Sequence, residues 1–258
     1  MKDFNHLKIH SQYSICEGAV RIVELSKYCK ENRIKAIGLC DTNNLCGALE
    51  FSEAIAKSKT QPIIGTQINI NYKGHTGKIP LFAKDLEGYK NLIKLSSKSF
   101  LEIKEGEDPH CKIDDILKHS KGVVLLSGSY DDLIGNLFSK NLSDEILFLF
   151  KKLKETFKDN FYLEVQRHNE PGEKLFEKFI LDSSKKIKLP IIATNEVFYL
   201  EKSMHEAHDA FICIGKKTYV NTKERKKYTD QHYLKSSEEM YDIFKDLPLM
   251  YKIRWWPS

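Results

Sequence analysis

Segments rich in strand-forming residues alternate with helix-forming segments along most of this chain. Such a βαβα rhythm predicts a mostly parallel sheet covered by helices, and six or more repeats of it favour a barrel or a large open sheet. We favour the barrel, an α/β fold. The expected strands are 4–10, 35–40, 62–70, 122–127, 160–166 and 190–194, and the expected helices are 19–32, 47–59, a stretch starting at Asp131, and 173–187.

The chain is expected to form one domain in the cytoplasm. Its 258 residues, 41% of them hydrophobic, supply a substantial core. No Pro/Gly/Ser-rich linker, low-complexity tract or fixed-period repeat divides it. No apolar run approaches the roughly 18 residues of a membrane span, and the start lacks a signal-peptide layout. Six cysteines without a C-x-x-C pair indicate reduced thiols.

The charge balance points to no particular partner. The chain has 41 basic and 36 acidic residues, and its one concentrated basic run is KERKK at 223–227. A nucleic-acid-binding protein concentrates its basic residues in a patch. We interpret this run as a solvated loop, with contact to nucleic acid or a partner as the alternative.

Polar residues stand at or just after the ends of the expected strands. In a parallel barrel these ends converge on one rim, where functional sites are built. Each residue also has a structural explanation, because a polar side chain at a strand end often caps the segment that follows. Their shared position predicts a cluster made of His10, Asp41, Gln67, Ser127, Ser129, His168, Asn195 and Glu196.

The first of these segments, HLKIHS at 6–11, carries an unexpected charge. In a strand, His6, Lys8 and His10 project to the same face. Two imidazoles on one face suggest the start of a metal site. A permanently charged ammonium between them conflicts with that interpretation.

Several segments, in order and spacing, resemble the PHP (polymerase and histidinol phosphatase) domain at the N-terminus of bacterial DNA polymerase III alpha subunits. The resemblance runs from Phe4 to Leu247 and implies one PHP domain over 1–248, with a distorted TIM-like (βα)7 barrel. In metal-binding members, rim side chains hold a cluster of divalent ions, and related domains hydrolyse phosphate esters. The matching segments are HLKIHSQYSICEGAVRI, IGLCDTNNLCGALEF, PIIGTQINI, LFAKDLEGYKNLIKLSSKSF, VVLLSGS, NFYLEVQRH, PIIATNEVFYL and YLKSSEEM.

This chain lacks most of the ligands that metal-binding members carry. Compared with that pattern, histidines are replaced by Lys8, Thr42, Lys78 and Phe198, a glutamate by Gln67, and a cysteine by Ser129. Side chains of a ligand type persist at His10, Asp41, His168 and Glu196, and His208 matches a further family histidine.

Lysines on the rim disfavour a metal cluster. Like charges about 4 Å apart repel by roughly 4 kcal/mol at an effective dielectric constant of 20. We expect the Lys8 ammonium to pair instead with Asp41 or Glu196, so that these carboxylates are not left unpaired. The favoured interpretation is a degenerate rim without a bound cofactor. The alternative is one residual zinc, manganese or magnesium ion on the four persisting ligand types.

The resemblance implies a scaffold that acts in DNA replication. Family members with a degenerate site pack against the polymerase body and dock the proofreading exonuclease subunit, among other DNA polymerase III holoenzyme subunits. The family's DNA-directed DNA polymerase (nucleotidyltransferase) chemistry belongs to palm carboxylates beyond this chain. The chain alone is therefore expected to be inactive and to meet DNA only through the full polymerase. The alternative is a stand-alone, metal-dependent phosphoesterase of the PHP family.

The resemblance stops near Leu247-Pro248. Both tryptophans, Trp255 and Trp256, lie in the last four residues, where the family continues into an alanine-rich helix. We interpret residues 249–258 as an aberrant tail produced by truncation or a frameshift, with a natural ending as the alternative.

Overall fold

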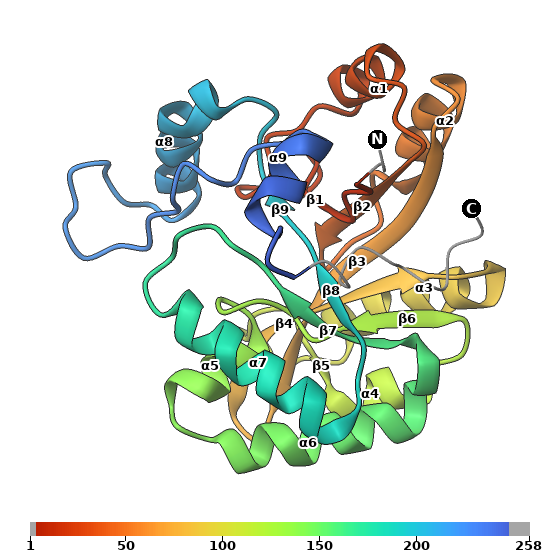
Figure 1. The fold of residues 1–258 in the computed structure, drawn as a ribbon, viewed down its shortest axis with the longest axis vertical. Helices are drawn as coiled ribbons and strands as arrows, with labels where there is room; N and C mark the ends of the chain where they lie inside the picture. The colour runs from red at the N-terminus through yellow and green to blue at the C-terminus, as the bar shows by residue number, and fades with distance from the viewer. Residues whose placement is uncertain (1–3, 248–258) are drawn as a thin grey trace.

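The computed structural model describes residues 4–247 and shows a curled sheet with helices packed around it (Figure 1). The expected strands are all present, although the first is short. The strands are β1 (Lys8–Ile9), β2 (Ala36–Thr42), β3 (Gln61–Tyr72), β4 (His75–Ala83), β5 (Cys111–Lys112), β6 (Val123–Leu126), β7 (Phe161–Val165), β8 (Ile191–Ala193) and β9 (Glu196–Val197).

The strands follow one another around a distorted barrel. Neighbours in the main sheet run in the order β2, β3, β4, β6, β7 and β8, while β1 pairs with β9. Only two residues separate β8 from β9, so together they resemble one interrupted strand. On the other side, Gly38 N of β2 donates to His6 O at 2.6 Å, and a side chain at Gly38 would clash with Leu7 O. This circuit confirms the expected TIM-like α/β barrel.

One strand departs from the expected parallel arrangement. β4 runs antiparallel to both β3 and β6. It follows β3 through Lys73 and Gly74, whose φ angles are 52° and 82°. Two successive positive φ values suit a tight hairpin turn, which is usually signalled by Asn-Gly or Asp-Gly. Lys-Gly gives a weaker signal, so the hairpin does not stand out in the sequence.

The helices agree with the expected ones over 19–32, 47–59 and 173–187, and two helices follow Asp131. The lysine side chains of α7 are exposed, while Phe176 and Ile180 are buried. The helices are α1 (Ile22–Glu31), α2 (Ala48–Lys57), α3 (Leu86–Leu101), α4 (Ile113–Lys118), α5 (Leu133–Ser139), α6 (Ser143–Phe157), α7 (Glu173–Ile187), α8 (His205–Gly215) and α9 (Ser237–Ile243).

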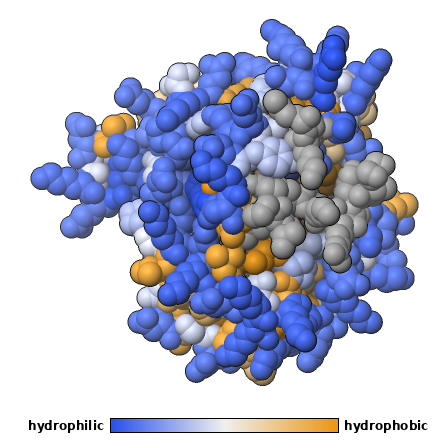
Figure 2. Space-filling model, in the orientation of Figure 1, coloured by the Kyte–Doolittle hydropathy of each residue, from blue (hydrophilic) through white to orange (hydrophobic). Residues whose placement is uncertain are grey.

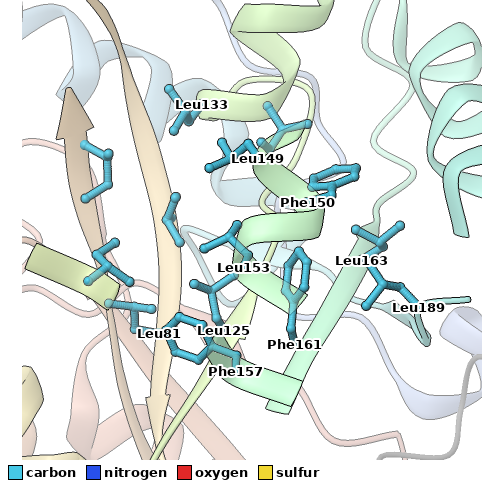
Figure 3. Packing of buried hydrophobic residues seen from close by; sticks show 14 of the residues in the cluster. Leu81, Leu125, Leu133, Leu149, Phe150, Leu153, Phe157, Phe161, Leu163 and Leu189 are labelled. Carbon is cyan, nitrogen blue, oxygen red and sulfur yellow. The ribbon is translucent and has the colours of Figure 1, made fainter. Parts of the chain in front are cut away.

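The largest part of the core lies between the sheet and α6. The buried positions Leu149, Phe150, Leu153 and Phe157 are spaced three or four residues apart, which places them on one face of the helix. Figure 3 shows this face against side chains from β4, β6 and β7. Each fully buried side chain of this size contributes about 2 kcal/mol. The core therefore holds these three strands in fixed positions.

Two further observations concern the rest of the chain. Within residues 4–247, no helix is long and apolar enough to cross a membrane. The segment 249–258, interpreted from the sequence as an aberrant tail, lies outside the described residues.

Candidate functional site

The Lys8 side chain lies inside the barrel, where no part of it is exposed to solvent. Its Nζ is 3.3 Å from Asp132 Oδ2, 3.6 Å from Glu164 Oε1 and 3.6 Å from Glu196 Oε2. These carboxylates come from the residue before α5, from β7 and from β9. We call Lys8, Asp132, Glu164 and Glu196 the ammonium cluster. One fixed cation thus faces three buried carboxylates.

Only part of this cluster can be predicted from the sequence. Glu196 is one of the two carboxylates expected to pair with Lys8. The other, Asp41, does not pair with it, and Asp132 and Glu164 were not anticipated. Glu164 has a visible signal, because it is the one charged residue in the otherwise apolar run FYLEV. Asp132 looks like an ordinary residue before a helix until the barrel closes around it.

The charges of the cluster stabilise one another. Burial lowers the pKa of Lys8, but the three carboxylates outweigh this effect and raise it well above its usual range. Burial raises the pKa of Glu196, yet Lys8 and a hydrogen bond from His10 bring it well below its usual range. Burial dominates at Glu164 and raises its pKa. The ammonium is therefore held in its charged form, facing at least one ionised carboxylate.

His10 and Asp41 lie beside the ammonium cluster. His10 bonds to a member of the cluster, whereas Asp41 bonds to residues outside it. His10 Nε2 is 3.1 Å from Glu196 Oε1. Asp41 accepts hydrogen bonds from Ser11 N and Ser11 Oγ, both at 2.7 Å, and from Ser14 Oγ at 2.8 Å. Burial raises the pKa of Asp41 despite these bonds. The Asp41 carboxylate therefore organises the loop after β1 and makes no contact with Lys8.

A second polar group contains three of the replaced positions. Lys78 forms an ion pair with Glu17, which also accepts a hydrogen bond from Thr42 Oγ1. Gln67 Nε2 donates to Thr42 Oγ1 at 3.0 Å. Burial raises the pKa of Glu17, but the opposing effect of its charged partners, chiefly Lys78, is larger and brings the pKa down to about 2. Glu17 was not predicted, since nothing in the run SICEGA marks it as a partner for a lysine 61 residues away.

The remaining predicted positions form hydrogen-bonded and stacked contacts. Ser129 donates to Asp132 from both its backbone N–H and its hydroxyl, at 2.8 and 2.9 Å. His168 Nε2 lies 3.1 Å from Asn195 Oδ1, and its ring stacks on His232 with centroids 4.1 Å apart. Burial lowers the pKa of His168 well below its usual range. It is therefore a neutral, hydrogen-bonded ring.

Phe198 and His208 continue this stacked region towards α8. The Phe198 ring lies 4.8 Å from His10 and 5.5 Å from His208, measured between ring centroids. His208 Nε2 is 2.8 Å from Glu17 O, so it fixes the backbone of the loop after β1. The phenyl ring of Phe198, which cannot bind a metal ion, thus occupies a position where metal-binding family members carry a histidine.

The donor set does not fit a metal cluster. Within residues 4–247, no three His, Cys, Asp or Glu side chains are arranged so that they can hold a metal ion. Of the four persisting ligand types, His10 and Glu196 bond to each other, Asp41 bonds to serines, and His168 bonds to Asn195. Glu196, one of the two carboxylates in this set, is also paired with the Lys8 ammonium. The arrangement is that of an internally paired polar core.

Comparisons with known proteins agree with this barrel. The model of the PHP domain family matches residues 6–168. DNA polymerase III subunit alpha of Rickettsia prowazekii (strain Madrid E) is 36% identical over 247 residues, and that of Caulobacter vibrioides (strain NA1000 / CB15N) is 34% identical over 253. Each match covers 95% of this chain, but only 21% and 22% of the relative. The chain thus spans about a fifth of the length of these relatives.

A solved structure shares the fold at low sequence identity. A protein from Bifidobacterium adolescentis, assigned as a metal-dependent phosphoesterase, superposes with a TM-score of 0.52 and 14% identity, covering 76% of this chain and 88% of that chain. An amidohydrolase from Chromobacterium violaceum gives a TM-score of 0.50 with 10% identity, covering 75% of this chain and 87% of that chain. At these identities the likeness concerns the fold alone.

Proposed function

Because this chain belongs to the PHP domain family, we propose that it is a non-catalytic PHP module that acts in DNA replication as part of a DNA polymerase III alpha subunit. The observation that carries this proposal is the Lys8 ammonium, which lies fully buried among Asp132, Glu164 and Glu196. A cation supplied by the chain takes the place that a catalytic metal would need.

The electrostatics of the ammonium cluster support an inactive rim. A divalent ion about 4 Å from Lys8 Nζ would be repelled by several kcal/mol at an effective dielectric constant near 20. Lys78 adds a second positive charge on the same rim, and it is neutralised by Glu17. A metal ion would have to overcome the charge of Lys8 while competing for Glu196, which is already paired with Lys8 and His10. Metal-assisted phosphate ester hydrolysis is therefore disfavoured.

The intact barrel supports the scaffold role. The barrel has a continuous hydrophobic core, so the module can present fixed surfaces to other proteins. The relatives are named DNA polymerase III subunit alpha, which supports a place within the polymerase. As the family resemblance implies, the proposed partners are the polymerase body, the proofreading exonuclease subunit and other subunits of the holoenzyme, in the cytoplasm. The module would meet DNA only through the full polymerase.

The competing proposal is a metal-dependent phosphoesterase. Its support is the shared fold with the protein from Bifidobacterium adolescentis, and a fold alone does not carry an activity. Multinuclear hydrolysis needs nearly the whole ligand set, whereas here Thr42, Gln67 and Phe198 stand at ligand positions. We therefore rank it second.

Metal content separates the two proposals. The purified chain is incubated with zinc and with manganese, loosely bound ions are removed, and the remaining metal is measured by mass spectrometry. The scaffold proposal expects far less than one ion per chain, and no hydrolysis of bis-(p-nitrophenyl) phosphate with either metal. One or more ions per chain, lost in Asp41→Ala, together with metal-dependent hydrolysis, would establish the phosphoesterase instead.

Binding tests the scaffold role directly. The chain is mixed with the purified proofreading exonuclease subunit of the same organism, and separately with the rest of the alpha subunit. Complexes are measured by gel filtration and calorimetry. We expect a stoichiometric complex with at least one of them. If neither binds at concentrations of tens of micromolar, the scaffold proposal fails.

A further inference from the structure

A segment beyond the barrel exposes apolar side chains that have no role in the fold. α8 and the chain that follows it extend away from the barrel (Figure 1). Ile214 is 75% exposed, Tyr219 83% and Val220 52%. Ile15, in the loop after β1, is 84% exposed, and its neighbour Cys16 packs directly against Gly215. The two isoleucines therefore lie on adjoining segments.

Hydrogen bonds hold this segment in a defined shape. Thr218 N donates to Cys213 O at 3.0 Å, which folds the chain back against the end of α8. Arg225 forms two hydrogen bonds with Asp209, at 2.7 and 2.6 Å, and its Nη2 also donates to Val220 O at 3.1 Å. A surface that is ordered before binding loses less conformational entropy when a partner arrives.

The same segment is strongly basic. Residues 216–227 contain six lysines and arginines and a single acidic residue, Glu224. Arg225 is paired with Asp209, and Lys226 lies 3.0 Å from Asp131. Over the part of the chain that the structure describes, the side-chain ammonium groups of Lys216, Lys217 and Lys223 form no hydrogen bond or ion pair. These three ammonium groups remain available to an anionic partner.

We call this the α8 surface and define it by seven exposed residues. Figure 2 shows a small apolar area on the protruding segment, surrounded by hydrophilic residues. Its members are Ile15, Ile214, Lys216, Lys217, Tyr219, Val220 and Lys223.

We propose that the α8 surface docks an acidic protein segment that also carries apolar side chains. This inference rests on the proposed scaffold function and names the chemistry of one of its contacts. The lysines complement carboxylates, while the apolar side chains gain about 25 cal/mol for each Å² that a partner removes from water. The lysines alone or the apolar side chains alone would fit many partners. Together they favour a segment that carries both carboxylates and apolar side chains.

The composition of the surface favours protein over nucleic acid. A single strand of DNA offers phosphates to the lysines and bases that can stack on Tyr219. It offers no comparable apolar surface to Ile15, Ile214 and Val220. Three exposed aliphatic side chains beside one aromatic ring are better matched by the leucine and phenylalanine side chains of a peptide.

Peptide binding tests the proposal. The probe is a fluorescent 15-residue peptide in which Glu and Asp are interspersed with Leu and Phe. The comparison probes have serines in place of the apolar residues, lysines in place of the acidic residues, or the sequence dT15. Binding to the full 258-residue chain is measured by fluorescence anisotropy at about 50 and 300 mM salt. We expect the acidic apolar peptide to bind best, and its affinity to fall several-fold at the higher salt concentration.

Paired variants locate the contact. Ile214→Ser and the double variant Lys216→Glu/Lys223→Glu should each weaken binding of the peptide at least roughly fivefold. α7 offers matched controls in Leu175→Ser, which is 69% exposed in the parent, and Lys185→Glu/Lys186→Glu, both on exposed lysines. These controls should leave the affinity unchanged. Circular dichroism confirms that each variant is folded.

Four results would overturn the proposal. One is an acidic apolar peptide that binds no better than its comparison peptides. Another is binding that changes equally in the α7 controls. The third is a dT15 affinity that exceeds that of the peptide and is lost in Lys216→Glu/Lys223→Glu, which would make this a nucleic-acid surface. A complex with the exonuclease that survives the α8 variants would keep the scaffold function while refuting this surface.

Discussion

Replacing Lys8 tests whether the ammonium cluster stabilises the barrel. Lys8→Met keeps an unbranched apolar side chain in the barrel, so it removes the charge with little loss of packing. It leaves Asp132, Glu164 and Glu196 without the cation that lies 3.3 to 3.6 Å away in the parent. Removing one partner of a buried ion pair costs about 3 to 5 kcal/mol. In a domain of this size, that corresponds to a melting temperature roughly 10 °C lower.

The measurement is urea unfolding at pH 7, followed by circular dichroism, with thermal unfolding as a second readout. Lys27→Ala serves as the control, because its ammonium is exposed and lies 3.9 Å from Glu31 in a surface pair. Such pairs contribute about 0 to 1 kcal/mol. If Lys8→Met is as stable as Lys27→Ala, the ammonium does not hold the carboxylates and the reasoning is wrong.

The pH dependence of Lys8→Met distinguishes lost charge from lost packing. Without the ammonium, the buried carboxylates should have raised pKa values in the folded state, as burial already produces at Glu164. A raised folded-state pKa favours the folded state at low pH, and this advantage is lost as the pH rises through that pKa. The stability difference between parent and variant should therefore shrink as the pH falls from 7 towards 5. A difference that stays constant would point to packing instead.

Two other side chains give independent predictions. Arg167→Ala should lower the free energy of unfolding by about 2 kcal/mol in urea titrations, because Arg167 forms charged hydrogen bonds with both Glu177 and Asp246, and unchanged stability would refute this role. Burial raises the pKa of Glu173 to about 7, so its contribution is present below about pH 4.5 and lost as the pH rises through 7. Over that range the parent should lose up to about 3 kcal/mol, and Glu173→Gln should lose less. Parallel stability profiles from pH 5.5 to 8.5 would contradict this assignment.

Much of the fold can be predicted from the sequence because the signals are local. The alternation of strands and helices gives the α/β class, and the apolar spacing of α7 gives its buried face. β4 is harder to predict, because its direction depends on a Lys-Gly turn whose left-handed conformation is not typical of lysine. Its antiparallel placement is settled by packing between β3 and β6.

The candidate site shows where local signals end. Lys8 stands out as a charge in an apolar strand, and Glu196 can be guessed as a partner. Asp132 reaches Lys8 across 124 residues, and Glu17 reaches Lys78 across 61. Such pairs depend on how the barrel closes, which no spacing in the sequence encodes. Asp41 was predicted to pair with Lys8, but its carboxylate instead accepts hydrogen bonds from two serines close to Lys8 in the sequence, Ser11 and Ser14.

The buried ammonium also changes what the domain needs from the cell. A metal ion must be captured from a limited and fluctuating supply, and apo forms of metal-dependent folds wait for it. Lys8 is synthesised with the chain, so its charge reaches the carboxylates whenever β1 joins the barrel. Under the proposed function, we expect maturation of this module to be uncoupled from metal availability, so that newly made copies are equally complete in starved and replete cells.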